Sequence, residues 1–481
     1  MSLNLTVPPT QPPSPSGSTV RYHSTRGQAP ELGFCDAVLA GLARDGGLYV
    51  PVEWPKFSPE DIAAMAGLPY AEVCKRVLAP FVGDEIAPDA LGEMIDEAYQ
   101  AFGHPAVAPL VQSGPNMFIL ELFHGPTLAF KDVAMQLLSR MVDHILAGRG
   151  ERITVVGATS GDTGSAAIEA FRGRDASDIF ILFPDGKVSD VQRRQMTTVA
   201  DANVHCLAVT GDFDDCQALV KAMFNHHAFR DAKNLSGVNS INWGRIMPQI
   251  VYYFTSALAL GAPNRPVSFC VPTGNFGDIF AAYVAKQMGL PIDRLIIATN
   301  SNDILHRTLE TGRYEKNAVQ ATTSPSMDIQ VSSNFERLLF LASGRDADYV
   351  QRCMSSLAQS GSFELGDEVL TAIRNAFDSG AADESQVAQT IRQSSNQCDY
   401  IVDPHTAVGL HVAVYHEGSA PMVVLGTAHP AKFPDAVHSA CGTWPDLPRR
   451  LKGLMDGEER FTVIENALNA VEGYISEHSR V

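Results

Sequence analysis

A lysine at the start of an amphipathic segment stands in a setting that suits covalent chemistry. Lys131 ends the run HGPTLAFK at 124–131, in which a Gly-Pro turn and a short apolar patch precede a helical pattern of apolar residues. Loss of hydration in a half-apolar pocket lowers the pKa of such an amine and helps it to form a Schiff base. An arbitrary lysine is more often a surface residue. A helix N-terminus disfavours a cation, however, so this position asks for another explanation.

Three turns that contain glycine follow expected strands, which is where open α/β sheets bind ligands. The first turn, GATSGDTG at 157–164, is rich in hydroxyls and main-chain N–H donors at a helix start, and these suit an anion such as a carboxylate. It matches neither the Walker loop nor the dinucleotide-binding pattern, because its glycines have the wrong spacing. A plain strand-to-helix connection is the alternative interpretation.

The other two turns offer different groups. The turn TGNFGD at 273–278 has two glycines three positions apart, so its backbone can surround an oxyanion with several N–H groups. The turn GTAHPAKFP at 426–434 offers the Thr427 hydroxyl at a strand end. His429 and Lys432 could serve as catalysts there, but a structural role is the favoured interpretation for each.

A fourth polar cluster, NSINWGR at 239–245, places two amides, a hydroxyl and a guanidinium at a helix start. Arginine provides a planar fork of donors, and asparagine and serine add neutral ones, so the group suits a phosphate. The alternative is that Asn or Ser caps the helix while Arg245 is solvated. Taken alone, the cluster does not separate the two.

Alternating strands and helices must position these turns. The expected strands lie at 153–159, 179–183, 204–209, 267–272, 295–299, 400–402 and 422–425. The expected helices lie at 132–147, 165–171, 190–200, 214–229, 246–260 and 279–288. Near-continuous apolar strands that alternate with helices are typical of parallel sheets covered on both faces.

The sequence also predicts how the chain is divided. Residues 1–19 contain prolines and no charged side chain, which indicates a flexible tail and not a signal peptide. An N-terminal α/β domain is expected at 20–105 and a small α/β domain at 151–235. A large domain would combine 106–150 with 236–481 and contain a helical insertion at about 333–395.

Composition narrows the class of protein. A chain of 481 residues with 45% apolar and 19% charged residues fits a globular enzyme with a large core. The net charge of -18 argues against nucleic acids and anionic membranes as main partners. Eight cysteines without a CxxC pair or a His/Cys cluster predict reduced thiols and no metal site. With no apolar stretch long enough to cross a bilayer, the expected compartment is the cytoplasm.

Together and in this order, the motifs resemble those of the threonine synthases, enzymes of the pyridoxal-phosphate fold type II that includes the β subunit of tryptophan synthase. The resemblance covers nearly the whole chain after residue 20 and rests on YHSTRG at 22–27, DGGL at 45–48, HGPTLAFKD at 124–132, TSGDTG at 159–164, NSIN at 239–242, GNFGD at 274–278 and TAHPAKF at 427–433. The long N-terminal part and the helical insertion resemble the longer subgroup of this family, which is found in bacteria and fungi. This implies an α/β fold with two three-layer domains built on parallel sheets, an N-terminal α/β extension and a helical insertion.

The resemblance implies how pyridoxal 5'-phosphate would be bound. Lys131 would hold the cofactor as a Schiff base and later move protons. Thr427 would hydrogen-bond the pyridine nitrogen, a neutral partner that leaves the ring a milder electron sink than a carboxylate would. The cofactor phosphate would bind the loop of Gly274, Asn275, Phe276, Gly277 and Asp278. Asp162 stands where many relatives carry asparagine near the cofactor's 3'-oxygen, and a carboxylate there would repel a phenolate unless it were protonated or turned away.

The resemblance also implies a substrate and a reaction. O-Phospho-L-homoserine and water would give L-threonine and phosphate by γ-elimination and β-addition of water. Separately, we expect a monomer or homodimer. The substrate carboxylate would bind Thr159, Ser160 and Thr163, and its phosphate Asn239, Ser240 and Arg245. An alternative on the same scaffold is a phospho-lyase that releases 2-oxobutyrate and phosphate. A non-catalytic, nucleotide-binding α/β protein is the alternative from another class, and it would be colourless.

Overall fold

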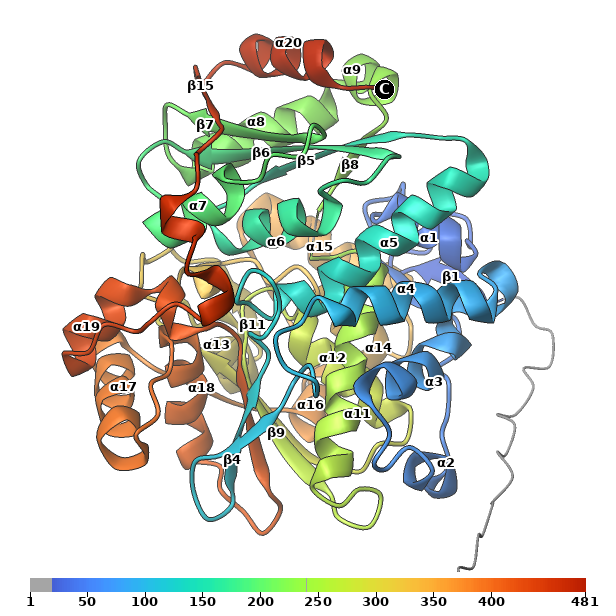
Figure 1. Ribbon diagram of the computed structural model, residues 1–481. Coiled ribbons are helices and arrows are strands. Elements are labelled where there is room, and N and C mark those ends of the chain that lie inside the picture. Colours follow the sequence, from blue (N-terminus) through green and yellow to red (C-terminus); the bar gives the residue numbers. More distant parts are fainter. Residues whose placement is uncertain (1–19, 239) are drawn as a thin grey trace, which may run out of the picture.

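The structure is a computed structural model that describes residues 20–238 and 240–481. Two sheets form its framework, a smaller one in the upper part of Figure 1 and a larger one below it. The tail expected at 1–19 and the predicted phosphate ligand Asn239 lie outside the described residues. Within the described ranges, none of the helices is long and apolar enough to span a bilayer.

The larger sheet has six strands in the order β13-β10-β9-β14-β4-β3. They are Asp378–Ala381, Ile292–Thr299, Val267–Pro272, Met422–Gly426, Met117–Glu121 and Leu110–Gln112. All neighbours are parallel except β3, which pairs antiparallel with β4. Every residue of β9 and β14 is buried, because helices cover both faces of a parallel sheet. The carboxyl ends of β9, β14 and β4 therefore meet at one edge.

The smaller sheet has five parallel strands in the order β15-β7-β6-β5-β8. They are Thr462–Ile464, Val204–Val209, Ser177–Pro184, Ile153–Ala158 and Leu235–Gly237. β15 comes from the end of the chain, and the following α20 (Leu468–His478) packs on α8 (Phe213–Asn225), as Figure 1 shows at the top. The sequence division, which puts all of 236–481 in the large domain, is therefore wrong for this last segment.

Helix α5 (Lys131–Arg149) lies between the two sheets (Figure 1). It is buried on most of its circumference because it packs on α6 (Asp162–Phe171) and on α4 (Pro88–Gln100). Gly150 ends it in the left-handed conformation, where the lack of a side chain removes the steric cost. The expected helix at 132–147 is thus confirmed and extends slightly at both ends.

The N-terminal segment packs beside α5 as an α/β unit. Strand β1 (Tyr22–Ser24) pairs antiparallel with β2 (Tyr49–Pro51). Aromatic residues of the N-terminal segment surround the buried indole of Trp243, whose ring centroid lies 5.9 Å from that of Tyr22 and 5.5 Å from that of Phe81. The other helices here are α1 (Phe34–Ala40), α2 (Pro59–Ala63) and α3 (Tyr70–Val82), with the short η1 (Gly83–Glu85).

The insertion expected at 333–395 contains four helices, α14 (Phe335–Ala342), α15 (Ala347–Ser360), α16 (Asp367–Ala376) and α17 (Glu384–Cys398). It is more than a helical cap, because β13 forms an edge of the large sheet beside β10. A second strand, β12 (Ser362–Glu364), pairs with β11 (Arg313–Glu315). Both strands are very short, and a signal of that length is too weak to predict from sequence.

Two expected elements differ from the structure. The strand expected at 400–402 is wrong: these residues connect α17 to α18 (Pro404–Val414), which the Asp403 carboxylate caps. A short buried apolar run does not by itself distinguish a strand from a connection. The helix expected at 214–229 breaks at His226, where the backbone leaves helical geometry between α8 and α9 (His227–Ala232).

The remaining elements are close to the expected ones or short. The helices are α7 (Asp190–Thr197), α10 (Trp243–Ile246), α11 (Ile250–Ala259), α12 (Gly277–Gln287), α13 (Ile304–Thr311) and α19 (Pro434–Cys441). Single 3-10 turns are η2 (Met247–Gln249), η3 (Pro325–Met327), η4 (Pro430–Lys432), η5 (Arg449–Leu451) and η6 (Leu454–Asp456).

Candidate active site

Three adjacent strands of the large sheet bring the predicted residues to one edge. β4 leads to the Lys131 turn, β14 leads to Thr427, and β9 leads to the glycine loop at 273–278. The first two turns contact each other directly, since the Phe130 N–H donates to the Thr427 carbonyl oxygen at 2.8 Å. Parallel strands with aligned ends therefore collect segments that lie far apart in the chain, as expected for a ligand site in an open α/β sheet.

The turn before Lys131 is held by the carboxylate of Asp132. It accepts hydrogen bonds from the Thr127 N–H at 2.8 Å and from the Thr127 hydroxyl at 2.6 Å. Burial raises the pKa of Asp132 to about 6, although the bonds from Thr127 and the charge of Lys432 oppose this. A Cβ atom at Gly125 would lie 2.4 Å from the Cβ of Asp132, so glycine is required there. This turn fixes the start of α5.

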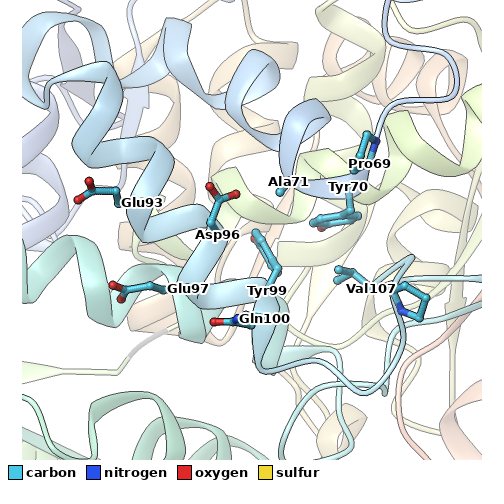
Figure 2. A pocket seen from close by; sticks show the side chains of 10 residues that line it. Pro69, Tyr70, Ala71, Glu93, Asp96, Glu97, Tyr99, Gln100 and Val107 are labelled. Atoms are coloured by element: carbon cyan, nitrogen blue, oxygen red, sulfur yellow. The ribbon is translucent and has the colours of Figure 1, made fainter.

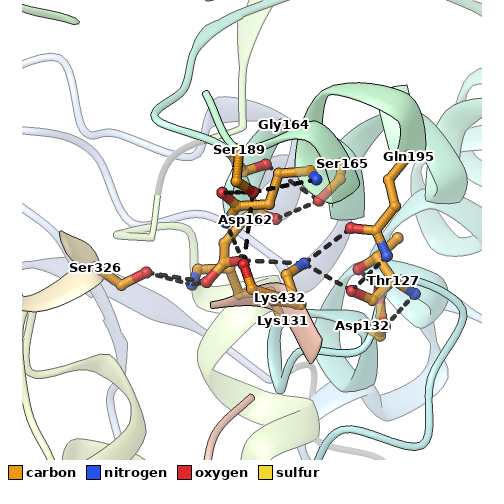
Figure 3. Close-up of polar contacts among 12 residues, drawn as sticks. Thr127, Lys131, Asp132, Asp162, Gly164, Ser165, Ser189, Gln195, Ser326 and Lys432 are labelled. Carbon is orange, nitrogen blue, oxygen red and sulfur yellow. Dashed lines mark hydrogen bonds and ion pairs between the residues drawn. The ribbon is translucent and has the colours of Figure 1, made fainter. Parts of the chain in front are cut away.

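The Lys131 amine is buried and faces polar partners (Figure 3). Its Nζ lies 3.4 Å from Asp162 Oδ2 and donates to Ser326 Oγ at 3.3 Å. Burial lowers the pKa of Lys131; the Asp162 charge opposes this effect, whereas the charges of Lys432 and Arg245 add to it. A buried amine with a lowered pKa is suited to attack a carbonyl group and to accept a proton.

Asp162, at the start of α6, is the centre of a buried polar cluster (Figure 3). Its Oδ1 lies 3.0 Å from Lys432 Nζ and accepts a 2.9 Å bond from Gln192 Nε2. Its Oδ2 accepts a 3.1 Å bond from Ser326 Oγ. Burial alone would raise the pKa of Asp162, but the charges of Lys432, Lys131 and His405 hold it well below its usual value. The carboxylate is therefore ionised and faces Lys131, and is neither protonated nor turned away.

Lys432 and His429, which the sequence favoured as structural, differ in the structure. Lys432 is fully buried and belongs to the Asp162 cluster. His429 lies outside this cluster and caps η4, its Nδ1 accepting a 3.2 Å bond from the Ala431 N–H. Burial, together with the charges of Arg450 and His124, lowers the pKa of His429 to about 4. His429 is thus a neutral structural residue, whereas Lys432 contacts the site.

The glycine loop presents unpaired donors at the start of α12. In the described ranges, the N–H groups of residues 274–278 have no protein acceptor. The carbonyls are held on the other side, since Ser332 Oγ donates to Gly274 O at 2.6 Å and Asn334 Nδ2 to Asn275 O at 2.9 Å. A Cβ at Gly274 would lie 2.8 Å from the Ser326 carbonyl oxygen. Free donors at a helix N-terminus suit an anion such as a phosphate.

Two members of this loop carry side chains that point away from the donors. Phe276 adopts φ of 63° and its buried ring packs on Phe335. Asp278 accepts hydrogen bonds from the hydroxyls of Tyr252 and Tyr253, the latter at 2.7 Å. Burial raises the pKa of Asp278 to about 6, although the tyrosine hydroxyls oppose this. Asp278 therefore offers its N–H to a ligand, not its carboxylate.

The turn at 157–164 divides its hydroxyls between two tasks. Thr159 Oγ1 accepts 2.9 Å bonds from the N–H groups of Gly161 and Gly164 and so shapes the turn itself. No hydrogen bond in the described part of the chain involves the Ser160 or Thr163 hydroxyl, and both residues are half-buried. Thr427 is buried, and its hydroxyl likewise has no partner among the described residues. These three hydroxyls can serve a ligand.

The cluster at 239–245 contains a buried cation. Arg245 donates from Nη1 to the Val238 carbonyl at 3.0 Å, and its Nε has no partner among the described residues. Burial lowers the pKa of Arg245 to about 10. Ser240 faces the loop side by accepting a 3.2 Å bond from Asn334 Nδ2 at its carbonyl oxygen. The helix is capped by Asn242, whose Oδ1 accepts from the Gly244 N–H at 2.9 Å.

Three residues that shape the site were not predicted from the sequence. Ser326 on η3 contacts both Lys131 and Asp162, and Gln192 on α7 contacts Asp162. His405 accepts the Ser326 N–H at Nε2, 3.2 Å away, and pairs with Asp403 through Nδ1 at 2.7 Å. Ser326 and Gln192 stand outside any motif. For His405, the Asp-Pro-His run after an apolar segment was a usable signal for a capped, buried imidazole.

A separate hollow of about 450 Å³ lies between the start of α3, α4 and the loop that follows α4 (Figure 2). The carboxylates of Glu93, Asp96 and Glu97 line it together with the rings of Tyr70 and Tyr99. Asp96 forms a surface ion pair with Lys75 at 2.9 Å. An acidic wall repels an anion, so this hollow does not suit one, whereas the glycine loop and Arg245 do.

The site fits an aldehyde that carries an anionic group. The buried amine would bond the carbonyl carbon, and the free N–H groups of the glycine loop would bind the anion. Arg245, a buried cation without a carboxylate contact in the described residues, suits a second anion. In the same ranges, no group of three or more His, Cys, Asp and Glu side chains has metal-binding geometry.

Comparisons with known proteins agree with this chemistry. Residues 21–99 match the family described as threonine synthase N terminus, residues 105–425 that described as pyridoxal-phosphate dependent enzyme, and residues 406–475 that described as threonine synthase, C-terminal. The threonine synthase of Pseudomonas aeruginosa is 54% identical over 462 residues, which cover 95% of this chain and 98% of that protein. That of Schizosaccharomyces pombe is 42% identical and covers 94% and 96%.

Solved structures show the same likeness. The crystal structure of PLP-bound threonine synthase from Brucella melitensis has a TM-score of 0.95 and 62% identity, covering 96% of this chain and 100% of that one. Threonine synthase from yeast has a TM-score of 0.90 and 41% identity, covering 96% and 99%. The likeness extends over both sheets, the N-terminal unit and the insertion.

Proposed function

The chain belongs to the threonine synthase family of pyridoxal-phosphate-dependent enzymes, and from this premise we propose that it converts O-phospho-L-homoserine and water to L-threonine and phosphate. The observation that carries the proposal is the buried Lys131 amine at the same sheet edge as two separate anion sites. One anion site suits the phosphate of the cofactor, and the other suits the phosphate of the substrate. A substrate without a phosphate group would leave the Arg245 cation unpaired.

The chain's own residues would hold the cofactor at three places. Lys131 Nζ would bond its aldehyde carbon, the N–H groups of 274–278 would bind its phosphate, and the free Thr427 hydroxyl would donate to its ring nitrogen. When bound, the cofactor supplies a conjugated ring that takes up the electron pair of a broken C–H bond. Because a hydroxyl does not protonate the ring nitrogen as a carboxylic acid does, Thr427 would keep that electron demand moderate.

Two anchors would fix the substrate. Its carboxylate would bind the turn at 157–164 through the Ser160 and Thr163 hydroxyls, while Thr159 keeps the turn in shape. Its phosphate would bind Arg245. Anchoring both ends selects which hydrogens of the chain between them face Lys131. Such positioning lowers the barrier by several kcal/mol, part of the ~7–11 kcal/mol available to ideal alignment.

Proton transfer would depend on the Lys131 amine. Its lowered pKa leaves Nζ able to take the proton of the α-carbon, to release it again, and then to take one from the β-carbon. Ser326 and Asp162 contact Nζ and fix its direction. Phosphate would leave the γ-carbon while Arg245 stabilises its charge, and water would add at the β-carbon. We further expect a monomer or homodimer in the cytoplasm, whose reducing conditions suit eight free thiols.

A product assay tests the proposal. Purified protein with bound cofactor is incubated with O-phosphohomoserine, and phosphate, threonine and 2-oxobutyrate are measured together. We expect equal amounts of phosphate and threonine. Lys131→Ala should abolish both products and the visible absorbance of the bound cofactor, whereas the surface variant Lys75→Ala should retain them. Equal amounts of phosphate and 2-oxobutyrate would contradict the proposal, as would activity in Lys131→Ala.

A further inference from the structure

The buried Lys432, which pairs with Asp162, has no part in the roles described so far. We infer that Lys432 is a positioning residue that neutralises Asp162, so that a carboxylate can lie beside the ring hydroxyl of the cofactor without repelling it. The inference rests on the proposed linkage of the cofactor to Lys131. It concerns the charge of the pocket and not the identity of the reaction.

The contacts of Lys432 are those of an ammonium group. Its Nζ lies 2.7 Å from Thr127 O, 3.0 Å from Gln195 Oε1 and 3.0 Å from Asp162 Oδ1 (Figure 3). The first two contacts are hydrogen bonds and the third is an ion pair, so three oxygen atoms surround the ammonium group. The side chain is 0% exposed, so water does not replace any of them. Lys432 is therefore held as a cation against Asp162.

Asp162 places its two oxygens toward different lysines. Oδ1 faces Lys432 at 3.0 Å, and Oδ2 faces the Lys131 amine at 3.4 Å. In the cofactor, the aldehyde and the ring hydroxyl are on adjacent ring carbons. A cofactor bonded to Lys131 Nζ therefore has its hydroxyl oxygen in the region that Asp162 faces. Without Lys432, two negative oxygens would meet there; with it, the carboxylate and the ammonium have no net charge.

Other charged groups face the same region from neighbouring elements. They are Lys131 and Asp132 of α5, Arg245 of α10, Asp278 of α12, His405 of α18, and Asp403, which caps α18. Three of these have partners of their own, since Thr127 holds Asp132, two tyrosines hold Asp278, and His405 holds Asp403. Lys432 is the cation in contact with Asp162 Oδ1. Its removal changes the charge beside the cofactor by one.

A pH titration of cofactor absorbance in the holoenzyme tests this. The protonated Schiff base absorbs at longer wavelength than the neutral one, so the midpoint reports the charge near Lys131. Lys432→Gln leaves Asp162 uncompensated, which favours the protonated form and should raise the midpoint by about 1–3 pH units. Asp162→Asn leaves Lys432 uncompensated and should lower it by a similar amount. The double variant Asp162→Asn/Lys432→Gln should return near the wild-type midpoint.

Two further variants make the result decisive. Lys432→Arg keeps the charge and should keep the midpoint, whereas a purely structural role predicts equal midpoints in all variants and would overturn the inference. If Lys432→Gln does not fold, the difference in midpoint between Asp162→Asn and the double variant isolates the effect of Lys432.

Thermal unfolding of the cofactor-free proteins adds a second readout. The double variant should melt at a higher temperature than either single variant, and additive losses would overturn the inference. A Schiff-base band that persists in Lys131→Ala would instead disprove the linkage, and with it both proposals.

Discussion

Two buried cations near Lys131 differ in their surroundings. Lys432, on η4, donates two hydrogen bonds and forms an ion pair with the Asp162 carboxylate. Arg245, on α10, makes one hydrogen bond to a carbonyl and has an unpaired Nε among the described residues. A satisfied buried charge is part of the protein's own structure, whereas an unsatisfied one is costly unless a ligand pairs with it. The first should therefore matter to folding, and the second to binding.

The largest effect should come from breaking the satisfied pair. Lys432→Met keeps most of the apolar stem of the side chain but leaves the Asp162 carboxylate buried without its main partner. The free energy of unfolding should fall by about 3–5 kcal/mol. Denaturant unfolding of the cofactor-free protein measures this, with the surface variant Lys75→Met as control. A loss below about 1 kcal/mol would contradict the comparison, because that is the size of a surface pair.

Arg245→Leu should have the opposite profile. Among the described residues no carboxylate pairs with this guanidinium, so the free energy of unfolding of the variant should stay within about 1 kcal/mol of the wild type. The substrate phosphate would lose its cation, and kcat/KM for O-phosphohomoserine should fall by about 100-fold or more. Steady-state kinetics and denaturant unfolding on the same preparation separate the two effects. Loss of stability with unchanged kcat/KM would sink the assignment of Arg245 to the ligand.

Asp278 lies between the satisfied and the unsatisfied buried groups. Its Oδ1 accepts from two tyrosine hydroxyls, whereas Oδ2 has no partner in the described residues. Burial raises its pKa from 3.8 to about 6, so the folded protein binds this proton more tightly than the unfolded chain does. The resulting stability is complete below the unfolded pKa and is lost as pH rises through about 6. The free energy of unfolding of Asp278→Asn should therefore rise relative to that of the wild type, by up to about 3 kcal/mol, as the pH increases from 4 to 7. A pH-independent difference would contradict this.

The smallest effect should come from Ser326, an uncharged residue that hydrogen-bonds both Lys131 and Asp162. Ser326→Ala removes hydrogen bonds to Lys131 and Asp162, whose other partners remain. The free energy of unfolding should fall by about 1 kcal/mol, and kcat should fall a few fold. Ser333→Ala, at a hydroxyl with one long hydrogen bond of 3.4 Å to Asn275, is the matched control. A loss as large as that of Lys432→Met would make Ser326 a main support of the pair.

The bounds of helices and strands were predicted best where the pattern of apolar residues is continuous along the chain. Apolar runs bounded by glycine turns predicted β7 and β9 at their observed bounds, and the start of α5 to within one residue. The sequence could not predict contacts between distant segments. The pairing of Lys432 with Asp162 joins residues far apart in the chain, and nothing in the turn around Lys432 indicates which carboxylate it meets. The assignment of hydroxyls within 157–164 was equally hidden, because Thr159 and Ser160 differ in backbone geometry and not in chemistry.

The strand at 462–464 has a consequence for biosynthesis of the chain. It closes the side of the small sheet next to β7, although the other strands of that sheet have all been made by residue 237. A growing polypeptide can therefore assemble most of this sheet while its outer backbone groups still lack their final neighbour. Until residues 462–464 leave the ribosome, that open edge can pair with another nascent chain. Truncation after residue 458 should recreate this vulnerable state permanently.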